Sequence, residues 1–370
     1  MAIFKTLVTK IPIPNDKKIK QKSYLQMGNL AIIDQGLSFI GGYTNDTSYQ
    51  LDFDLPVIVF GDHTCCVKYL TFPFAAGADG IKVLKPCINV LPKYLYYGTQ
   101  YLVLCLPDRG YARHYQHIEK MELPVPPIAE QQRIVTRIEE LFSELDSAVE
   151  TLQKTKQQLE VYRQAVLKEA FAECQSTVKV NDVCKHVTDG DHMPPPKAET
   201  GIPFIMISNI DKNVINWNGT AFVNREYYEN INDKRRPQKG DVLYTVTGSF
   251  GIPVLVDFDR EFCFQRHIAL LRPNNRIIQK YLYYVMQESE VYQQAEKKST
   301  GTAQKTVSLS VLRNIEIPFV ESVKEQERIV EKIESQLYVC DGIERTIEES
   351  LQQAEAMRQS ILKKAFEGRL

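Results

Sequence analysis

Two short polar loops carry the side chains best suited to chemistry. Asp108–Gln116 reads Asp-Arg-Gly-Tyr-Ala-Arg-His-Tyr-Gln, and Ser299–Thr306 reads Ser-Thr-Gly-Thr-Ala-Gln-Lys-Thr. Glycine lets a backbone approach a ligand closely, and Arg, Gln and Lys are side chains that read base edges or hold phosphates. Both loops are therefore candidates for contact with a nucleic acid. An exposed, solvated loop is the alternative for either one taken alone.

Three histidine-containing clusters are weaker candidates. His63–Cys66, and His114 together with His117, could suggest a metal, but neither has a second pair of ligands at metal-site spacing. Asp189–His192 resembles an acid–base cluster, which a polar turn explains equally well. No phosphate-binding glycine motif, nucleophile elbow or His-Glu-x-x-His motif occurs. The sequence therefore predicts neither a metal site nor an enzyme.

Composition and charge set the class of protein. The 370 residues are 44% hydrophobic and 25% charged, which is typical of soluble globular chains with two or three domains. No apolar run is long enough to cross a membrane and no secretory core is visible, so we expect a cytoplasmic protein with reduced cysteines. The net charge of −1 divides into +3 and +1 for residues 1–129 and 176–322, against −3 and −2 for residues 130–175 and 323–370. This balance permits a nucleic-acid partner without identifying one.

The chain repeats itself. Glu130–Glu173 aligns without gaps with Glu325–Gly368, 195 residues later, and 18 of 44 positions are identical, including EQ-x-RIV at the start and LK-x-AF at the end. Upstream, the sequence KYLYY occurs at Lys93–Tyr97 and again at Lys280–Tyr284. Such self-similarity indicates a tandem duplication of a globular part followed by a helix.

The repeat extends less clearly towards the start of each copy. Leu30–Gly36 aligns with Cys184–Gly190 at an offset of 154, so the second copy contains roughly 33 extra residues. Those residues include Gly201–Ile205, the sequence Gly-Ile-Pro-Phe-Ile. On this alignment the first domain is short and lacks that segment.

Each EQ segment begins a long helix. In residues 130–173 apolar or small side chains recur at alternating steps of four and three, which is a heptad seam, and no Pro or Gly interrupts them. The seam residues are Ile134, Ile138, Leu141, Leu145, Ala148, Leu152, Thr155, Leu159, Tyr162 and Val166. Such a helix is about 66 Å long. Two equivalent helices in one chain can pair antiparallel with an internal pseudo-twofold, and packing of each helix on its own domain is the alternative.

The globular parts have an α+β pattern. Helices are expected over Pro92–Leu104 and Gln279–Glu296, and glycine-rich connections mark turns. The strand-like runs are Pro56–Phe60, Ile81–Leu84, Phe204–Ile207, Asp241–Thr247, Val254–Val256 and Ile268–Leu271. The tyrosines of the two KYLYY segments are expected in the core between helix and sheet.

Taken together, these motifs resemble the specificity subunit of type I restriction–modification systems, over essentially the whole chain. The doubled EQ-x-RIV segments with their preceding prolines and long helices are the most specific features. Further typical segments in the second copy are Thr188–His192, Gly201–Ile205, Lys239–Leu243 and Gly301–Lys305. The second copy departs from the usual Pro-x-Pro by reading Pro318-Phe-Val.

The resemblance implies a non-catalytic DNA reader. Its expected fold is α+β, with two methyltransferase-type α/β target-recognition domains (residues 1–129 and 176–322). Two long antiparallel coiled-coil helices (residues 130–175 and 323–370) separate them with a pseudo-twofold. Each domain would read one half of a bipartite target in double-stranded DNA. Two modification subunits with S-adenosylmethionine, and restriction subunits with ATP and magnesium, would dock on this chain, which would itself bind no cofactor and no membrane.

The candidate DNA contacts lie on the polar loops of both copies. They are Tyr43, Asp62, His63, Asp79, Arg109, Tyr111, Arg113, His114, His192, Thr247, Ser249, Gln265, Arg266, Thr302, Gln304 and Lys305. A specificity subunit of a related bifunctional restriction system, a fused methyltransferase or nuclease, and a coiled-coil scaffold without a DNA role remain the alternatives.

Overall fold

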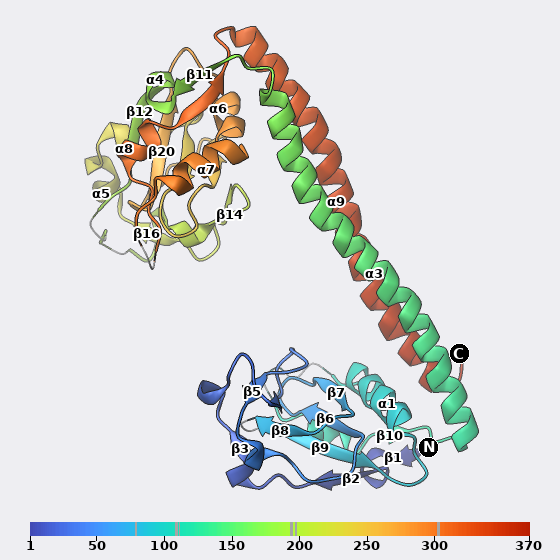
Figure 1. The fold of residues 1–370 in the computed structure, drawn as a ribbon. Helices are drawn as coiled ribbons and strands as arrows, with labels where there is room; N and C mark the ends of the chain where they lie inside the picture. The colour runs from blue at the N-terminus through green and yellow to red at the C-terminus, as the bar shows by residue number, and fades with distance from the viewer. Residues whose placement is uncertain (78–79, 108–109, 111, 193–194, 197, 302–303) are drawn as a thin grey trace. The chain divides into compact units, whose positions relative to one another are not determined.

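The structure is a computed structural model that describes residues 1–370 except 78–79, 108–109, 111, 193–194, 197 and 302–303. It divides into two compact units. Unit 1 comprises Met1–Gln153 and Glu348–Leu370, and unit 2 comprises Lys154–Ile347. Each unit holds one globular domain and one half of each of two long helices (Figure 1). We call the globular parts the N-terminal domain (residues 1–127) and the C-terminal domain (residues 172–322).

The two long helices have the predicted length. Helix α3 (Ile128–Phe171) and helix α9 (Val323–Phe366) contain 44 residues each. They run antiparallel within each unit (Figure 1), and ion pairs join them. In unit 1, Arg358 of α9 pairs with Asp146 of α3, and in unit 2, Arg163 of α3 pairs with Asp341 of α9 at 2.5 Å. The two pairs occupy positions related by the 195-residue repeat, so one contact is made twice.

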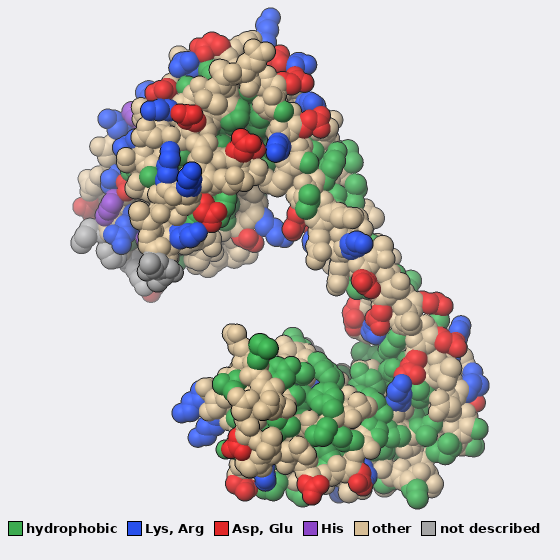
Figure 2. Space-filling model, in the orientation of Figure 1, with side chains coloured by type: hydrophobic (Ala, Val, Ile, Leu, Met, Phe, Trp, Pro, Cys, Tyr) green, Lys and Arg blue, Asp and Glu red, His purple; other side chains and the backbone are tan. Residues whose placement is uncertain are grey.

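The heptad seam is less continuous than its sequence pattern. Ile134, Leu159 and Val166 are buried, but Ala148 is exposed and Tyr162 is 50% exposed. Most of the buried side chains lie near the helix ends, where side chains of the globular domains add a third packing surface, although Cys340 and Ile347 near the middle of α9 are also buried. Acidic and basic side chains are interspersed along the visible surface of the helices (Figure 2). Along the described part of the chain, no helix is both long and apolar enough to cross a membrane.

The N-terminal domain stacks a helical layer on two sheets. The first sheet has the order β2-β9-β6-β7, all antiparallel. Its strands are β2 (Val8–Ile11), β9 (Ile81–Pro86), β6 (Val57–Gly61) and β7 (Val67–Leu70). Strand side chains alternate between faces, so Ile58 and Phe60 face helix α1 (Pro92–Leu104) and the long helices, whereas Val57 and Val59 face the second sheet. Helix α1 has the predicted bounds.

The second sheet of this domain has the order β3-β8-β4-β5, with β3 and β4 parallel to β8. Its strands are β3 (Lys18–Ile19), β8 (Phe74–Gly77), β4 (Leu30–Ile33) and β5 (Gly42–Thr44). The remaining elements are β1 (Ala2–Ile3), β10 (Glu122–Leu123), α2 (Tyr115–Ile118), and the 3-10 turns η1 (Phe4–Thr6), η2 (Asn15–Lys17), η3 (Gln21–Ser23) and η4 (Thr47–Tyr49).

The C-terminal domain repeats this plan. Its first sheet has the order β12-β20-β17-β18 and its second the order β16-β13-β19. The strands are β12 (Cys184–Asp189), β20 (Ile268–Pro273), β17 (Val242–Thr245), β18 (Pro253–Leu255), β16 (Ala221–Val223), β13 (Ile202–Ile205) and β19 (Cys263–Phe264). Two further pairs are β11 (Ser176–Lys179) with β21 (Glu316–Phe319), and β14 (Ile210–Asp211) with β15 (Val214–Ile215). The helices are α4 (Val180–Val183), α5 (Arg225–Asn230), α6 (Gln279–Val285), α7 (Ser289–Lys297) and α8 (Leu309–Arg313), with 3-10 turns η5 (Ile207–Asn209) and η6 (Asp233–Arg235).

The prediction of a single helix over Gln279–Glu296 is wrong. The chain leaves helix α6 after Val285 and starts helix α7 at Ser289. Glu288 makes the break, because its buried carboxylate accepts a hydrogen bond from the Glu290 backbone N–H at 2.8 Å and caps the new helix.

The upstream alignment of the two copies is also wrong. Strand β12 lies beside β20 as β2 lies beside β9, so the counterpart of Cys184–Asp189 is Val8–Ile11. Strand β4 runs parallel to β8 and antiparallel to β5, as β13 does to β19 and β16. Leu30–Ile33 is therefore the counterpart of Ile202–Ile205. The first domain does not lack this strand, and the second is longer in its connections, which include the hairpin β14–β15.

Candidate nucleic-acid interface

The repeated EQ motif builds the attachment of each domain to its helix. The carboxamide of Gln131 accepts a hydrogen bond from the Leu91 backbone N–H (2.9 Å) and donates to the carbonyls of Asn89 (3.0 Å) and Pro126 (2.8 Å). Gln326 repeats the arrangement. It accepts from the Ile278 N–H (2.9 Å) and donates to the carbonyls of Arg276 (2.7 Å) and Val320 (2.9 Å).

Both glutamines are almost completely buried, with exposures of 1% and 0%. Because a buried amide must be hydrogen-bonded, each fixes the start of a long helix against the start of the domain helix. This contact explains why the chain carries the motif twice.

The C-terminal end of each long helix packs on a helix that contains a KYLYY segment. The end of α9 packs on α1 of the N-terminal domain, and the end of α3 packs on α6 of the C-terminal domain. Phe366 at the end of α9 lies 5.1 Å from the ring of Tyr94 and stacks on Tyr101 at 5.3 Å between ring centroids. Phe171 at the end of α3 lies 5.2 Å from the ring of Tyr281. The core placement expected for the KYLYY tyrosines is confirmed for Tyr94, Tyr97 and Tyr281, whereas Tyr96, Tyr283 and Tyr284 are only half-buried at the edge of the core. Each domain is thus held between the beginning of one long helix and the end of the other.

The polar loop of the C-terminal domain lies at the end of the central strand β17. Thr300 and Thr306 close the loop through two backbone hydrogen bonds of 3.0 and 2.7 Å. The Gly248 N–H donates to the Lys305 carbonyl at 2.9 Å, which attaches the loop to the residues that follow β17. Gln304 and Lys305 are exposed, as is Ser249, whereas Thr247 is buried. The Lys305 ammonium also pairs with Glu296 at 2.9 Å.

Several predicted residues meet in a groove beside that loop. The groove consists of two adjoining hollows of about 310 and 270 Å³ that share His192, Arg266 and His267. Gln265 lines the first hollow and Thr247 the second. His192 is held by the Asp189 carboxylate at 2.7 Å, and the Arg266 N–H donates to the Asp191 carbonyl at 3.0 Å. The exposed donors of His192 and Arg266 suit phosphate or base-edge oxygens.

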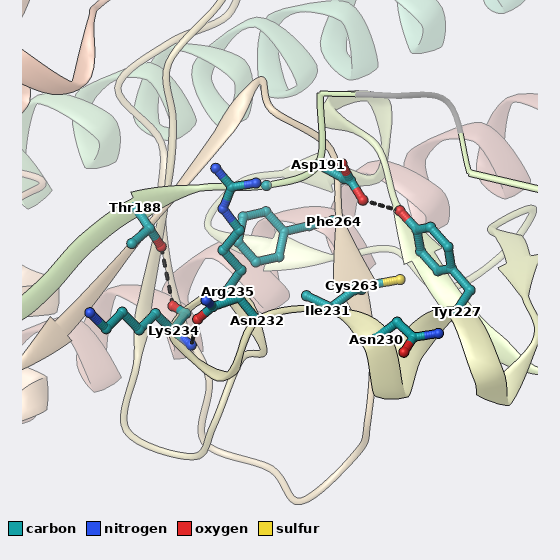
Figure 3. Close-up of a pocket in the computed structure, with 11 residues that line it drawn as sticks. Thr188, Asp191, Tyr227, Asn230, Ile231, Asn232, Lys234, Arg235, Cys263 and Phe264 are labelled. Carbon is teal, nitrogen blue, oxygen red and sulfur yellow. Dashed lines mark hydrogen bonds between the residues drawn. The ribbon is translucent and has the colours of Figure 1, made fainter.

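A third pocket, of about 430 Å³, lies on the other side of the Thr188–Asp191 segment (Figure 3). Helix α5 and turn η6 form its second wall. The Tyr227 hydroxyl donates to the Asp191 carboxylate across the pocket, and Arg235 pairs with Asp189 at 3.3 Å. Burial, followed by the hydrogen bond to Asp191, raises the pKa of Tyr227, so the phenol remains a donor at neutral pH.

The polar loop of the N-terminal domain occupies the equivalent strand end. Asp62, directly after β6, is buried, accepts a hydrogen bond from the Tyr115 N–H (3.0 Å) and pairs with Lys82 (3.3 Å). Its carbonyl accepts from the His114 N–H at 2.8 Å. Arg113 is exposed, whereas His114 is buried and its Nε2 lies 3.3 Å from the Gly110 carbonyl. The carboxylate of Asp62 therefore anchors the loop that presents Arg113.

Of the two other predicted residues that the structure describes in this domain, one contacts the loop. His63 Nδ1 lies 3.1 Å from the Ala112 carbonyl, so its ring also contacts the loop. Tyr43 is half-buried in the outer strand β5 of the second sheet, paired with Ala31. Asp79, Arg109, Tyr111 and Thr302 lie outside the described residues.

The two cysteines beside His63, Cys65 and Cys66, are half-buried. Burial raises the pKa of the Cys65 thiol, with Cys66 and Asp62 adding to the shift, so the thiol stays protonated. Within the described residues, no three His, Cys, Asp or Glu side chains come together to hold a metal ion.

Sequence reasoning missed several residues of these sites. His267, Asp189 and Arg235 were not among the candidates, although His267 adjoins Arg266 and Asp189 belongs to a recognised polar cluster. The roles of Gln131 and Gln326 were signalled by the exact repetition of the EQ motif.

Comparison with known proteins agrees with this geometry. The type I restriction enzyme EcoBI specificity subunit of Escherichia coli is 27% identical over 278 residues, covering 67% of this chain. The chain spans 58% of the length of that relative. The EcoR124I/EcoR124II specificity subunit of Escherichia coli is 24% identical and covers 95% of this chain and 89% of the relative.

Solved structures have the same fold. A chain from a study of complex assembly and conformational transition in a type I R-M system matches with a TM-score of 0.65 and 19% identity, covering 85% of this chain and 82% of that one. The HsdS subunit from Thermoanaerobacter tengcongensis matches with a TM-score of 0.50 and 16% identity, covering 100% and 96%. The family model of the type I restriction modification DNA specificity domain matches residues 8–161 and 175–353. The chain therefore belongs to the type I restriction modification DNA specificity family and carries two copies of its domain.

Proposed function

We propose that this chain selects the DNA target of a type I restriction–modification complex, with each domain reading one half of a bipartite sequence. One observation carries the proposal. The two domains are attached to the helices through the same contacts, but the loops at their equivalent strand ends carry different side chains. Conserved attachment with divergent loops is what two readers of different half-sites require.

The chemistry of the complex belongs to other subunits in this proposal. Two modification subunits would carry S-adenosylmethionine and methylate adenine, restriction subunits would use ATP and magnesium, and the complex would work in the cytoplasm. The long helices expose the apolar side chains of Val161, Tyr338 and Val339, at 72%, 79% and 58%. In this proposal, partner subunits would cover these side chains when they dock on the helices.

The primary test is the methylated motif in cells. Cells that contain the partner subunits, with and without this chain, are compared by single-molecule sequencing of adenine methylation. A bipartite motif is expected only when the chain is present. The same methylation pattern in both cell lines would refute the proposed function.

The helices would also set the gap between the half-sites. Seven residues inserted into both helices, at the equivalent positions Thr155 and Ser350, keep the seam in phase and lengthen each helix by about 10 Å. We expect the gap in the methylated motif to grow by about three base pairs while both half-sites stay unchanged. The same insertion in only one helix is the matched control and should abolish methylation, because the seam loses its register. A paired insertion that leaves the gap unchanged in an active complex would contradict the proposal.

A further inference from the structure

The N-terminal domain carries a dense run of positive charge outside the candidate site. Lys17, Lys18, Lys20 and Lys22 fall within six residues, and Asp16 is the one acidic residue of the sequence Pro14–Ser23. Lys20 and Lys22 are exposed, and Lys17 and Lys18 are half-buried. We call residues 17–22 the lysine segment. Figure 2 shows Lys and Arg side chains gathered at one side of the N-terminal domain.

The fold places the lysine segment beside the site at the strand ends. Strand β3 runs through the segment and lies parallel to β8, as does β4. Because parallel strands end at the same edge of a sheet, Lys20 and Lys22 emerge at the edge where Gln35 and Gly80 follow β4 and β8. Gln35 reaches the site itself, since its side-chain oxygen accepts a hydrogen bond from the His63 N–H at 3.3 Å.

The C-terminal domain has positive charge at the corresponding place, but from a different segment. Lys234, Arg235 and Arg236 lie in or directly after turn η6. Asp233 of the same turn pairs with Arg236, so the turn carries three cations against one carboxylate. We call residues 234–236 the basic turn. Its counterpart η4 carries no Lys or Arg, nor does the whole connection of residues 45–56 before β6.

In both domains, the end of the first sheet strand or the connection that follows it contacts the turn that precedes the central strand. The two domains differ in which of these two segments carries the positive charge. In the N-terminal domain, Lys17 of the lysine segment donates to the Ser48 carbonyl of turn η4. In the C-terminal domain, Arg235 of the basic turn pairs with Asp189 at the end of β12. The cation thus comes from the connection after the first sheet strand in one domain, and from the turn before the central strand in the other.

Four lysines in six residues repel one another, and an anion that binds there relieves this repulsion. A position that is positive in both copies, through unrelated segments, indicates that the charge is used. We propose that the lysine segment and the basic turn bind DNA phosphates that flank the half-sites. This inference rests on the proposed function. The contacts add affinity without reading sequence, since phosphates are the same for every base pair.

The test measures how binding depends on salt. Lys18, Lys20 and Lys22 are replaced by Gln in the full chain, which is assembled with its modification subunits. Dissociation constants are measured between 50 and 200 mM salt for a duplex with the target and for a scrambled duplex. Each phosphate contact contributes about 0.9 to the slope of log K against log salt. Over this range the wild-type complex should therefore lose about 40-fold more affinity than the triple variant.

Three further variants make the test specific. Lys5→Gln with Lys120→Gln removes two exposed lysines near the other end of β2, and it should leave the slope unchanged. Replacing Lys18, Lys20 and Lys22 by Arg should restore the wild-type slope, which excludes a folding defect. Lys234→Gln should lower the slope by about 0.9.

The outcomes separate this inference from the function on which it rests. An equal loss of affinity on both duplexes, with an unchanged methylated motif, supports phosphate contact. An unchanged slope, or a loss confined to the target duplex, overturns it. If the wild-type complex bound the target and scrambled duplexes equally well, the proposed function would be wrong. The salt slopes of wild type and triple variant on the scrambled duplex would then still show whether the lysines contact phosphates.

Discussion

In unit 1, the N-terminal domain is held by Gln131 at the start of α3 and by Phe366 at the end of α9. In unit 2, Gln326 at the start of α9 and Phe171 at the end of α3 hold the C-terminal domain. The strand ends differ. The first domain buries Asp62 under its loop, whereas the second closes its loop through backbone hydrogen bonds between Thr300 and Thr306.

This difference shows that the attachment of the two domains and the loops at their strand ends meet different requirements. The attachment has to be the same in both copies if each helix is to serve both domains, and it is built from buried groups that tolerate little change. The loops carry no such constraint once their backbones are anchored. They can diverge in sequence, and even in the way they are anchored, without disturbing the attachment.

The largest effect is expected from the aromatic contacts at the helix ends. Phe366→Ala and Phe171→Ala each remove a side chain that is at least 96% buried, and we expect each to cost about 3–5 kcal/mol. Hydrogen exchange should show the loss in the N-terminal domain for Phe366→Ala and in the C-terminal domain for Phe171→Ala. Met357→Ala and Tyr162→Ala are the matched controls, because these equivalent positions are 54% and 50% exposed. If either phenylalanine variant lowered the hydrogen-exchange protection of both domains, the two attachments would not be independent of each other.

A smaller effect is expected from the buried carboxamides. Gln131→Ala leaves the Leu91 N–H and two carbonyls without their partner, which should cost about 3 kcal/mol, and Gln326→Ala should cost the same within error. The free energy of unfolding by urea measures both. The exposed neighbours Gln132 and Glu327, replaced by Ala, should stay within about 0.5 kcal/mol of wild type. Clearly unequal losses for the two glutamines would mean that the two attachments are not equivalent.

The sequence predicted elements whose pattern is local. The long helices and Pro92–Leu104 were found because their periodicity lies within one segment. Strands β3 and β4 were missed because strands of two and four residues have no distinctive period and depend on β8 for their pairing. For the same reason Leu30–Ile33 was matched to the wrong strand of the second copy. Short buried strands are interchangeable in sequence and distinct only in their neighbours.

The candidate site shows the same limit. Glycine and polar side chains located both loops, and the structure brings His192, Thr247, Gln265 and Arg266 together in one groove. The burial of Asp62 could not be predicted, since it depends on Tyr115, which is 53 residues away in the chain. A sequence can therefore indicate which loops face a ligand more readily than which of their side chains anchor the loop.

The smallest effect, and the one most specific to function, is expected from the exposed loop cations. Arg113→Ala and Lys305→Ala should each weaken DNA binding by about 1–2 kcal/mol, and each on its own half-site. Binding is measured on duplexes in which one half-site is scrambled, so that each domain is tested alone. Lys305 is already paired with Glu296, and part of its gain on DNA is offset by that partner. Glu296→Gln should therefore strengthen binding at the second half-site and leave the first unchanged. Arg113→Ala and Lys305→Ala variants that weaken both half-scrambled duplexes equally would show that the two loops do not read separate half-sites.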